Sequence, residues 1–307
     1  MGKYGIPYMG SKDKIAESIS MIFPKATHFY DLFGGGFSIS HCMLLNKRHR
    51  FEHFHYNEIK SDIVDLVKRA IAGEYNYDRF KPAWISREDF FANLDDPYIR
   101  VCWSFGNDQK TYLFGKESES YKKSMHMAVI FDEFDATARK VLGFSEWPSD
   151  VKTVKQRRFY LRQKVAFDSK GMSRGDLEQL QQLEQLERLQ QLERLQRLQQ
   201  LQRLQQLQRL EGLEFSALDY RAVPILPNSV VYCDIPYLGT ADYGEFNHKE
   251  FFDWAASRSF SVYISEYEIK DPRFKLIYEV DKRSMLSAKK SNVVKSERVY
   301  WNGVTNA

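Results

Sequence analysis

The stretch HFYDLFGGGFSISHCMLLNKRHRFEHFHYNE, residues 28–58, decides the fold class of this 307-residue chain. It predicts a strand over residues 28–33, a helix over residues 38–47 and a second strand over residues 54–58. Three glycines, at positions 34–36, separate the first strand from the helix. Strand, glycine turn, helix and strand open a βαβ unit, so we expect an α/β protein with a Rossmann-like sheet.

The same α/β pattern returns near the other end of the chain. Further strands are predicted at residues 213–218, 230–233, 261–265 and 275–279. A helix is predicted over residues 249–258, and the centre of the chain reads as mostly helical. We therefore expect one domain built from residues 1–60 and 214–307, with residues 61–174 forming a separate central segment.

Composition and charge exclude several classes of protein. With 43% hydrophobic and 28% charged residues, the chain has the composition of a folded globular protein. Its start lacks the basic and then apolar order of a secretion signal, and its three cysteines show no disulfide or zinc spacing. We expect a cytoplasmic protein without a membrane segment or a metal. The net charge of +4 is too small to identify a partner by itself.

Basic residues are concentrated between residues 150 and 174, a stretch that contains eight Lys or Arg residues and only two acidic ones. Aromatic residues are interleaved with them, as expected where cations meet phosphates and rings meet bases. A solvated helix face explains the same run. Leucine then occupies every third position of residues 177–213, thirteen times in all. Three residues turn an α-helix by about 300°, so no single apolar seam results, and residues 175–213 are interpreted as a low-complexity insert carried at the surface.

The three glycines and Glu58 form a candidate cofactor site. Glycines directly after a strand allow a tight turn and the close approach of a ligand to the main chain. Glu58 follows Gly36 by twenty-two residues and ends the next strand, where a carboxylate can accept both hydroxyls of a ribose. No GK[ST] sequence supports a nucleoside triphosphate. A simple turn with an unrelated surface Glu remains an alternative.

Residues 230–237, VVYCDIPY, give the sharper signal. An apolar strand delivers Asp234 to its carboxyl end, and Pro236 stiffens the turn that presents the ring of Tyr237. An acceptor beside a flat ring suits a planar amine. The alternative is a strand that ends in a turn, with Tyr237 in the core.

Together these motifs resemble the Dam-like, D12-class DNA adenine N6-methyltransferases, and phage-type members in particular. PYMGSK, residues 7–12, is similar to the N-terminal cofactor motif, and DLFGGGF, residues 31–37, to the DxFxGxG loop. DIPY, residues 234–237, resembles the catalytic DPPY, and FGNDQKTYLFGK in the centre also looks like phage members. The resemblance covers residues 1–63 and 214–302.

The resemblance implies an enzyme that transfers a methyl group from S-adenosyl-L-methionine to N6 of an adenine flipped out of double-stranded DNA, in a bacterial or phage-infected cell. It implies that residues 61–174 recognise the DNA. The implied cofactor residues are Tyr8, Gly10, Lys12, Asp31, Phe33, Gly34, Gly35, Gly36, Glu58, Asp219 and Asp234. The implied catalytic residues are Asp234, Ile235, Pro236 and Tyr237. The basic run then supplies DNA contacts through Lys152, Lys155, Arg157, Arg158, Arg162 and Lys164.

One departure from the family motif is Ile235, which stands where the family usually has proline. The family uses the main-chain carbonyl of this residue, which Ile retains, although the rigidity of Pro-Pro is reduced. Two rival functions stay open. One is a non-catalytic nucleic-acid-binding relative, and the other an amino-methyltransferase acting on cytosine N4 or on a protein glutamine. The recognition sequence, the oligomeric state and any restriction endonuclease partner are not given by the sequence.

Overall fold

The computed structural model describes residues 3–76, 80–168, 197, 199–208, 210–238, 246–283 and 294–305. Contacts divide the chain into two compact units. The sheet unit comprises Gly2–Ile6, Gly10–Lys68 and Leu207–Ala307, and the helical unit comprises Pro7–Met9 and Arg69–Gln206. Each unit has a hydrophobic core of its own.

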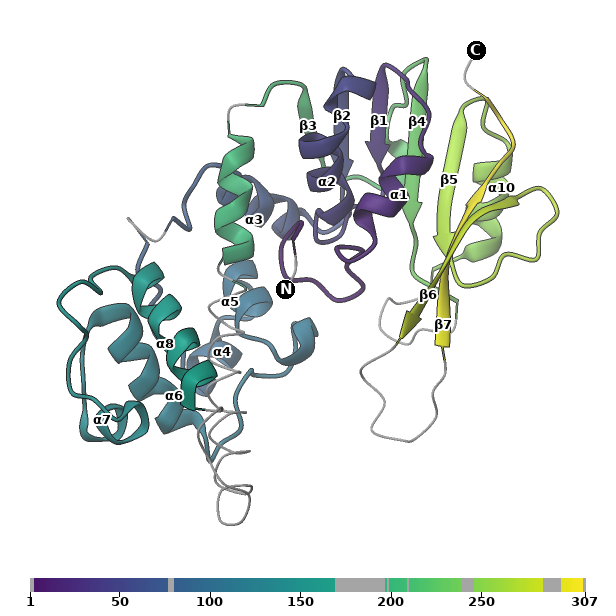
Figure 1. Cartoon of the computed structure of the whole chain (residues 1–307). Coiled ribbons are helices and arrows are strands. Elements are labelled where there is room, and N and C mark those ends of the chain that lie inside the picture. Colours follow the sequence, from purple (N-terminus) through teal and green to yellow (C-terminus); the bar gives the residue numbers. More distant parts are fainter. Residues whose placement is uncertain are drawn as a thin grey trace. The chain divides into compact units, whose positions relative to one another are not determined.

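The sheet unit is built on seven strands in the order β3-β2-β1-β4-β5-β7-β6 (Figure 1). In chain order the strands are β1 His28–Asp31, β2 His53–Asn57, β3 Leu213–Ser216, β4 Ser229–Asp234, β5 Ser261–Glu266, β6 Lys275–Arg283 and β7 Val294–Trp301. The first five are parallel, whereas β7 runs antiparallel to both β5 and β6. The predicted Rossmann-like α/β sheet is thereby confirmed.

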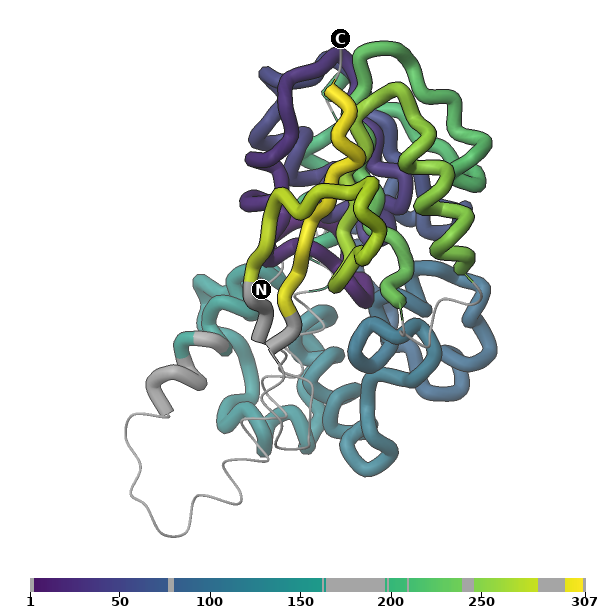
Figure 2. The backbone as a smooth tube through the Cα atoms, turned by 90° about the vertical axis from the view of Figure 1, so that its right-hand side faces the viewer, coloured from purple at the N-terminus to yellow at the C-terminus, as the bar shows by residue number. Residues whose placement is uncertain are grey.

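Helices cover both faces of this sheet. The helices of the sheet unit are α1 Ala16–Ile22, α2 Ser38–Asn46, α3 Ser61–Ile71 and α10 His248–Ala256, with short 3₁₀ turns at η1 Arg48–Arg50 and η5 Tyr220–Ala222. Figures 1 and 2 show α1 and α2 on one face and α10 on the other. The chain leaves β1 and β4 in opposite directions, and right-handed crossovers then place their helices on opposite faces. The ends of β1 and β4 therefore flank the topological switch point, where open α/β sheets bind ligands.

The strands and helices of the sheet unit form where the sequence predicts them, with one omission. β7 was not predicted, because Lys295, Glu297 and Arg298 make its segment read as a basic stretch. It is nevertheless an inner strand, paired on one side with β5 and on the other with β6. Pairing across the sheet thus overrides the polar local sequence.

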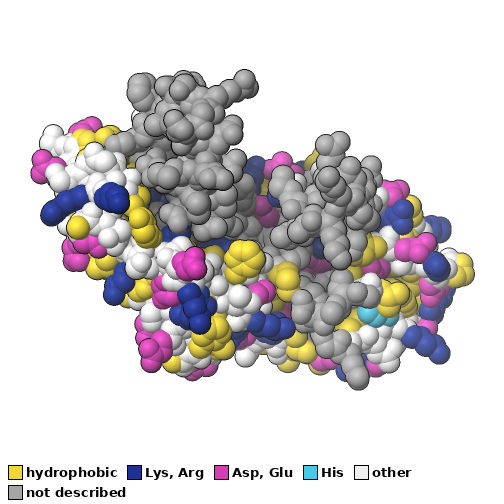
Figure 3. All heavy atoms as spheres, turned by 90° about the horizontal axis from the view of Figure 1, so that it is seen from below, with side chains coloured by type: hydrophobic (Ala, Val, Ile, Leu, Met, Phe, Trp, Pro, Cys, Tyr) yellow, Lys and Arg dark blue, Asp and Glu magenta, His cyan; other side chains and the backbone are white. Residues whose placement is uncertain are grey.

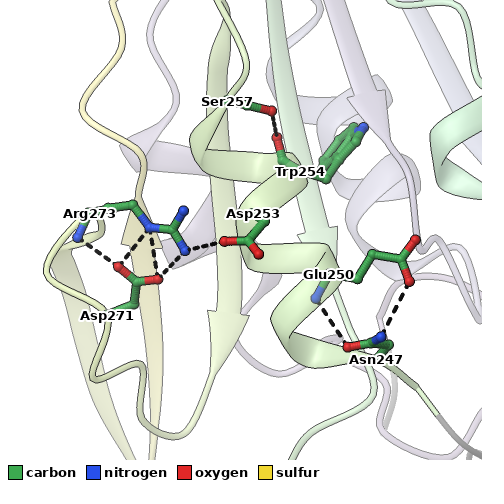
Figure 4. Close-up of polar contacts among 7 residues, drawn as sticks. All are labelled: Asn247, Glu250, Asp253, Trp254, Ser257, Asp271 and Arg273. Carbon is green, nitrogen blue, oxygen red and sulfur yellow. Dashed lines mark hydrogen bonds and ion pairs between the residues drawn. The ribbon is translucent and has the colours of Figure 1, made fainter.

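Helix α10 is fixed at both ends and along its side (Figure 4). The Asn247 side chain caps its first turn, accepting from the Glu250 amide at 3.1 Å, and Ser257 Oγ donates to Trp254 O at 2.8 Å. Arg273, from the loop before β6, bonds Asp271 and also reaches Asp253 of the helix at 2.8 Å. These contacts hold α10 in place behind β5.

The helical unit confirms the mostly helical centre predicted by the sequence. Its helices are α4 Arg87–Ala92, α5 Pro97–Cys102, α6 Glu119–His126, α7 Ala136–Leu142 and α8 Val154–Asp168, with shorter turns at η2 Phe105–Asn107, η3 Met127–Phe131 and η4 Leu204–Leu207. Ser86, Asp96 and Asp135 cap α4, α5 and α7 with their side chains. In the part of the chain that the structure describes, none of the helices combines the length and apolarity needed to cross a membrane.

The end of the leucine-triplet segment is not carried at the surface, contrary to the sequence prediction. Leu201, Leu204 and Leu207 are buried. Residues 199–203 are α-helical and η4 follows directly. A 3₁₀ turn has three residues per turn, so it aligns Leu204 and Leu207 on one side. The predictions for residues 175–196 lie outside the described residues.

Polar contacts also tie this segment into the helical unit. Gln205 accepts a hydrogen bond from Asn76 Nδ2 at 2.9 Å, and Arg197 donates to the carbonyl of Ser104. Gly73, with a φ of +83°, passes so close that an added Cβ would meet Gln205 Nε2 at 2.7 Å. The compact units accordingly divide at residues 68/69 and 206/207, whereas the sequence had placed the borders at 60/61 and 213/214.

We predict that Leu204→Ala lowers the free energy of unfolding by about 2–5 kcal/mol, because it leaves a cavity in a buried site. Gln208, four residues on and exposed, is the matched control, and Gln208→Ala should change the value by less than about 0.5 kcal/mol. Urea unfolding followed by circular dichroism measures both. Equal effects of the two substitutions would show that the segment does not contribute to the core.

Candidate active site

Three carboxylates lie at the carboxyl ends of neighbouring parallel strands. Asp31 ends β1, Glu58 directly follows β2, and Asp234 ends β4. Asp31 is paired in register next to Tyr56 on one side and Tyr232 on the other. The topology therefore brings to one edge three acids that the sequence analysis singled out from distant segments, at the switch point of the sheet.

Asp31 is the most deeply buried of these acids, with 1% of its surface exposed. Its Oδ2 accepts from the Ser40 hydroxyl at 2.7 Å and from the Ser40 amide at 3.2 Å, at the start of α2. The pKa of Asp31 is raised to about 7, chiefly by burial; the bonds from Ser40 lower it, and the nearby charges of Asp234 and Glu58 add to the rise. A cation at this edge would relieve that repulsion.

The glycine turn is held against the end of β2. Gly34 donates to Asn57 O at 2.9 Å, Tyr56 donates to Gly35 O at 2.7 Å, and Glu58 Oε2 accepts from Gly35 N at 2.9 Å. An added Cβ on Gly34 would lie 2.2 Å from the Tyr56 ring. This glycine is therefore required by packing within the turn, and not only by the ligand approach that the sequence suggested. Burial raises the pKa of Glu58.

Beside the turn, the Phe33 ring contacts Tyr220, Phe246 and Phe251, so it belongs to an aromatic cluster at the strand ends.

Asp234 holds a cation over the ring of Tyr237. The Lys12 ammonium lies 2.7 Å from Asp234 Oδ1 and 4.7 Å from the centroid of the Tyr237 ring. It also donates to Gly10 O at 3.2 Å. Burial raises the pKa of Asp234, and the ammonium of Lys12 opposes that rise. The sequence grouped Lys12 with the cofactor residues, whereas the structure places its ammonium on the acid of the DIPY turn.

The DIPY turn is held by three side chains that sequence reasoning missed. His248 Nε2, at the start of α10, lies 2.7 Å from Pro236 O. Glu266, the last residue of β5, accepts from Leu238 N at 3.0 Å. Glu297 of β7 accepts from the Tyr237 hydroxyl at 2.6 Å. In the sequence, these three residues are marked only by being charged or titratable and lying beside or within an apolar strand. That pattern is too common to indicate a site.

Ile235 itself is buried, with 2% of its surface exposed, in the core cluster that includes Val231, Cys233 and Ile264. Its side chain thus has an apolar environment of its own. The departure from proline is accommodated by packing, and the turn is held by hydrogen bonds from other elements.

Two further residues expected at the cofactor are Asp219 and Tyr8. Asp219, in the loop after β3, is partly exposed and accepts from Arg221 Nε at 2.7 Å. Its pKa is lowered, chiefly by this bond. Arg221 is also bonded to Glu250 of α10. Tyr8 belongs to the helical unit, whereas Gly10 and Lys12 belong to the sheet unit.

The basic run forms α8 and divides between two faces, which corrects the expected DNA contacts. Lys152 and Lys155 are exposed, but Arg157 and Arg158 are buried, with 6% and 3% of their surface exposed. Arg157 donates to Asp132 Oδ2 at 2.6 Å and to Val129 O at 3.2 Å. Both arginines are thus buried within the helical unit, and Arg157 is committed to contacts inside it. The side chains of Arg162 and Lys164 lie outside the described residues.

The rest of the described surface does not indicate a particular binding partner. On the face shown in Figure 3, the described Lys and Arg side chains lie among acidic and hydrophobic ones. Phe159 is the aromatic residue of α8 that projects from the surface, with 62% exposed. Within the described ranges, no group of three or more His, Cys, Asp or Glu side chains is arranged to hold a metal ion.

The parallel sheet, with acids gathered at its switch point, defines a Rossmann-like α/β fold with a candidate ligand site at its strand ends. Residues 8–270 match the sequence profile of the D12 class N6 adenine-specific DNA methyltransferases. The chain belongs to this family, and its activity is methylation of adenine N6 in DNA. No curated protein matches the chain significantly.

We predict that Asp31→Asn stabilises the protein more at pH 8 than at pH 5. The unfolded carboxyl ionises near 3.8 but the folded one only near 7, so the parent loses stability as the pH rises through this window, and Asn does not. Each unit of difference corresponds to about 1.4 kcal/mol. Urea unfolding at both pH values measures the difference. Parallel stability profiles of parent and variant would contradict the assigned pKa.

Proposed function

We propose that S-adenosyl-L-methionine is the methyl donor and that it binds at the switch point, between the glycine turn and the DIPY turn. The observation that carries this proposal is the charge of the site. Asp31, Glu58 and Asp234 all have pKa values raised by burial. Such a cluster favours a ligand with positive charge and disfavours phosphates. A sulfonium with an α-ammonium group supplies that charge, together with an activated methyl group.

The proposed cofactor residues follow the geometry of the strand ends. Glu58 would hold the ribose hydroxyls, and the glycine turn would provide the main-chain approach. Asp31 lies beneath this turn and would face the positive part of the cofactor. Tyr8, Gly10, Phe33 and Asp219 remain cofactor residues by resemblance alone.

The target amine would bind where the Lys12 ammonium now lies. An N–H donor 2.7 Å from Asp234 and above the Tyr237 ring has the contacts that N6 of a stacked adenine requires. We infer that the Lys12 ammonium occupies the position that the amine would take. It would withdraw when the base enters, and Gly10 O already accepts one of its hydrogens.

The chain's own residues would orient the amine for transfer. Adenine N6 is paired inside a duplex, so the base must be extruded, at a cost of a few kcal/mol. Tyr237 would recover part of this by stacking, while Asp234 and the Ile235 carbonyl would accept the two amine hydrogens. These bonds turn the nitrogen lone pair towards the methyl group. Orientation and proximity then supply most of the rate acceleration.

The helical unit is proposed to contact the DNA. Lys152 lies two residues before α8 and Lys155 in its first turn; both are exposed, and Phe159 follows Lys155 by four positions. Residues three and four apart share a helix face, so cations and an aromatic ring are presented together. This combination favours nucleic acid over a protein glutamine as substrate.

We predict that Asp234→Ala abolishes methyl transfer and leaves the affinity for S-adenosylmethionine within a few-fold, because the lost bond acts on the amine. Transfer is measured with labelled cofactor and unmethylated DNA, and affinity by calorimetry. Asp65→Ala, at an exposed acid of α3, is the control and should be active. Chromatography of the nucleosides identifies the product. Detection of N4-methylcytosine would show that cytosine, and not adenine, is the target.

Removing the exposed charges of α8 should weaken DNA binding at every sequence. Lys152→Ala with Lys155→Ala is expected to reduce the slope of log affinity against log salt by about 2, since each phosphate contact contributes about one unit. Lys123→Ala with Lys140→Ala removes the same charge from other exposed positions of the unit. Equal losses of DNA affinity in the two double variants would show that the basic run is only a solvated helix face with no specific role in DNA binding.

A further inference from the structure

Glu297 lies at a position of β7 where an apolar residue would be expected. It is buried, with 5% of its surface exposed, and Val299, two residues on and facing the same side of the sheet, is 1% exposed. Burying a carboxylate costs several kcal/mol, and replacing buried charges by well-packed apolar residues is often neutral or stabilising. A charged residue here is therefore a candidate for function and not for stability.

Glu297 Oε2 faces two groups of the site, the Lys12 ammonium at 3.9 Å and the aromatic residue of the DIPY turn. The Tyr237 hydroxyl donates to Glu297 Oε2 at 2.6 Å, across sixty positions of sequence. The Tyr237 ring also meets Tyr267 edge-on, with centroids 4.5 Å apart. At its backbone end the turn is tied to Glu266 through Leu238 N. The ring is thus fixed at its hydroxyl, at its side and at its main chain.

We propose that Glu297 is a positioning residue for methyl transfer, which holds the Tyr237 ring in the orientation needed to stack on the extruded adenine. The inference rests on the proposed function of the DIPY turn. It also explains how the turn keeps its geometry with Ile235 in place of the family's proline. A displacement of about 1 Å in a reacting group can cost about 100-fold in rate, so a ring free to tilt would slow the transfer.

The test is a set of substitutions around the Tyr237–Glu297 bond. We expect Glu297→Ala to slow single-turnover methylation by about 10- to 100-fold at saturating DNA and cofactor, with the affinity for S-adenosylmethionine within about three-fold. Glu297→Gln keeps an acceptor for the hydroxyl and should retain most of the rate. Glu279→Gln, at an exposed ion pair with Arg298 in the adjacent strand, is the matched control and should match the parent.

A double-mutant cycle separates positioning from a general structural effect. Tyr237→Phe removes the hydroxyl but keeps the ring, and should be slowed like Glu297→Ala. The double variant should be no slower than Glu297→Ala, because the hydrogen bond that Tyr237→Phe removes is already absent in that variant. With 2-aminopurine in place of the methylated adenine, both single variants should give a brighter complex than the parent, since a tilted ring stacks less on the base.

The outcomes distinguish this inference from the proposed site. If Glu297→Ala and Tyr237→Phe are as fast as the parent while Asp234→Ala is inactive, the positioning role is overturned and the site stands. If Asp234→Ala is active, the proposed site itself fails. Should Glu297→Ala fail to bind S-adenosylmethionine, Tyr237→Phe carries the test alone, and a parental rate for that variant overturns the inference.

Discussion

The burial of carboxylates at the switch point is the constraint on which the rest of the site depends. Asp31 and Asp234 end the two strands from which the chain turns in opposite directions, and burial, with a smaller contribution from the Asp234 charge, raises the pKa of Asp31 to about 7. Such a cluster is stable only with a cation nearby. Lys12 provides one at Asp234. The N-terminal segment is therefore coupled electrostatically to a strand two hundred residues later, which makes one site out of both chain ends.

The DIPY turn illustrates how rigidity can come from tertiary contacts in place of local chemistry. A Pro-Pro sequence restrains the backbone by itself. Here His248, Glu266 and Glu297 reach the turn from α10, β5 and β7. Helix α10 can serve as such a support because its own ends are capped and Arg273 joins it to the loop before β6. Loss of one proline is then tolerable, since three elements share the restraint.

Much of the sheet and of the acid cluster could be predicted from the sequence, because both depend on local signals. Strand β1, the glycine turn and α2 follow one another within a short stretch, and Asp234 stands at the end of an apolar run. β7 and Glu297 could not be predicted, since pairing between distant strands makes a polar segment an inner strand. The Lys12–Asp234 contact is likewise set by topology, and a motif position alone assigned Lys12 to the cofactor.

Charge runs and repeats are also difficult to interpret from sequence alone, because a count along the chain does not show which side of a helix each residue faces. The basic run was counted as one group of cations, but a helix places residues one apart about 100° from each other. In α8 this rotation exposes Lys155 and turns Arg157 and Arg158 into the unit, where Arg157 binds Asp132. The leucine triplets lack an α-helical seam, yet a short change to 3₁₀ winding buries Leu204 and Leu207 together. A run of similar residues therefore indicates a binding surface or a core only once the local helix geometry shows which of them are exposed and which are buried.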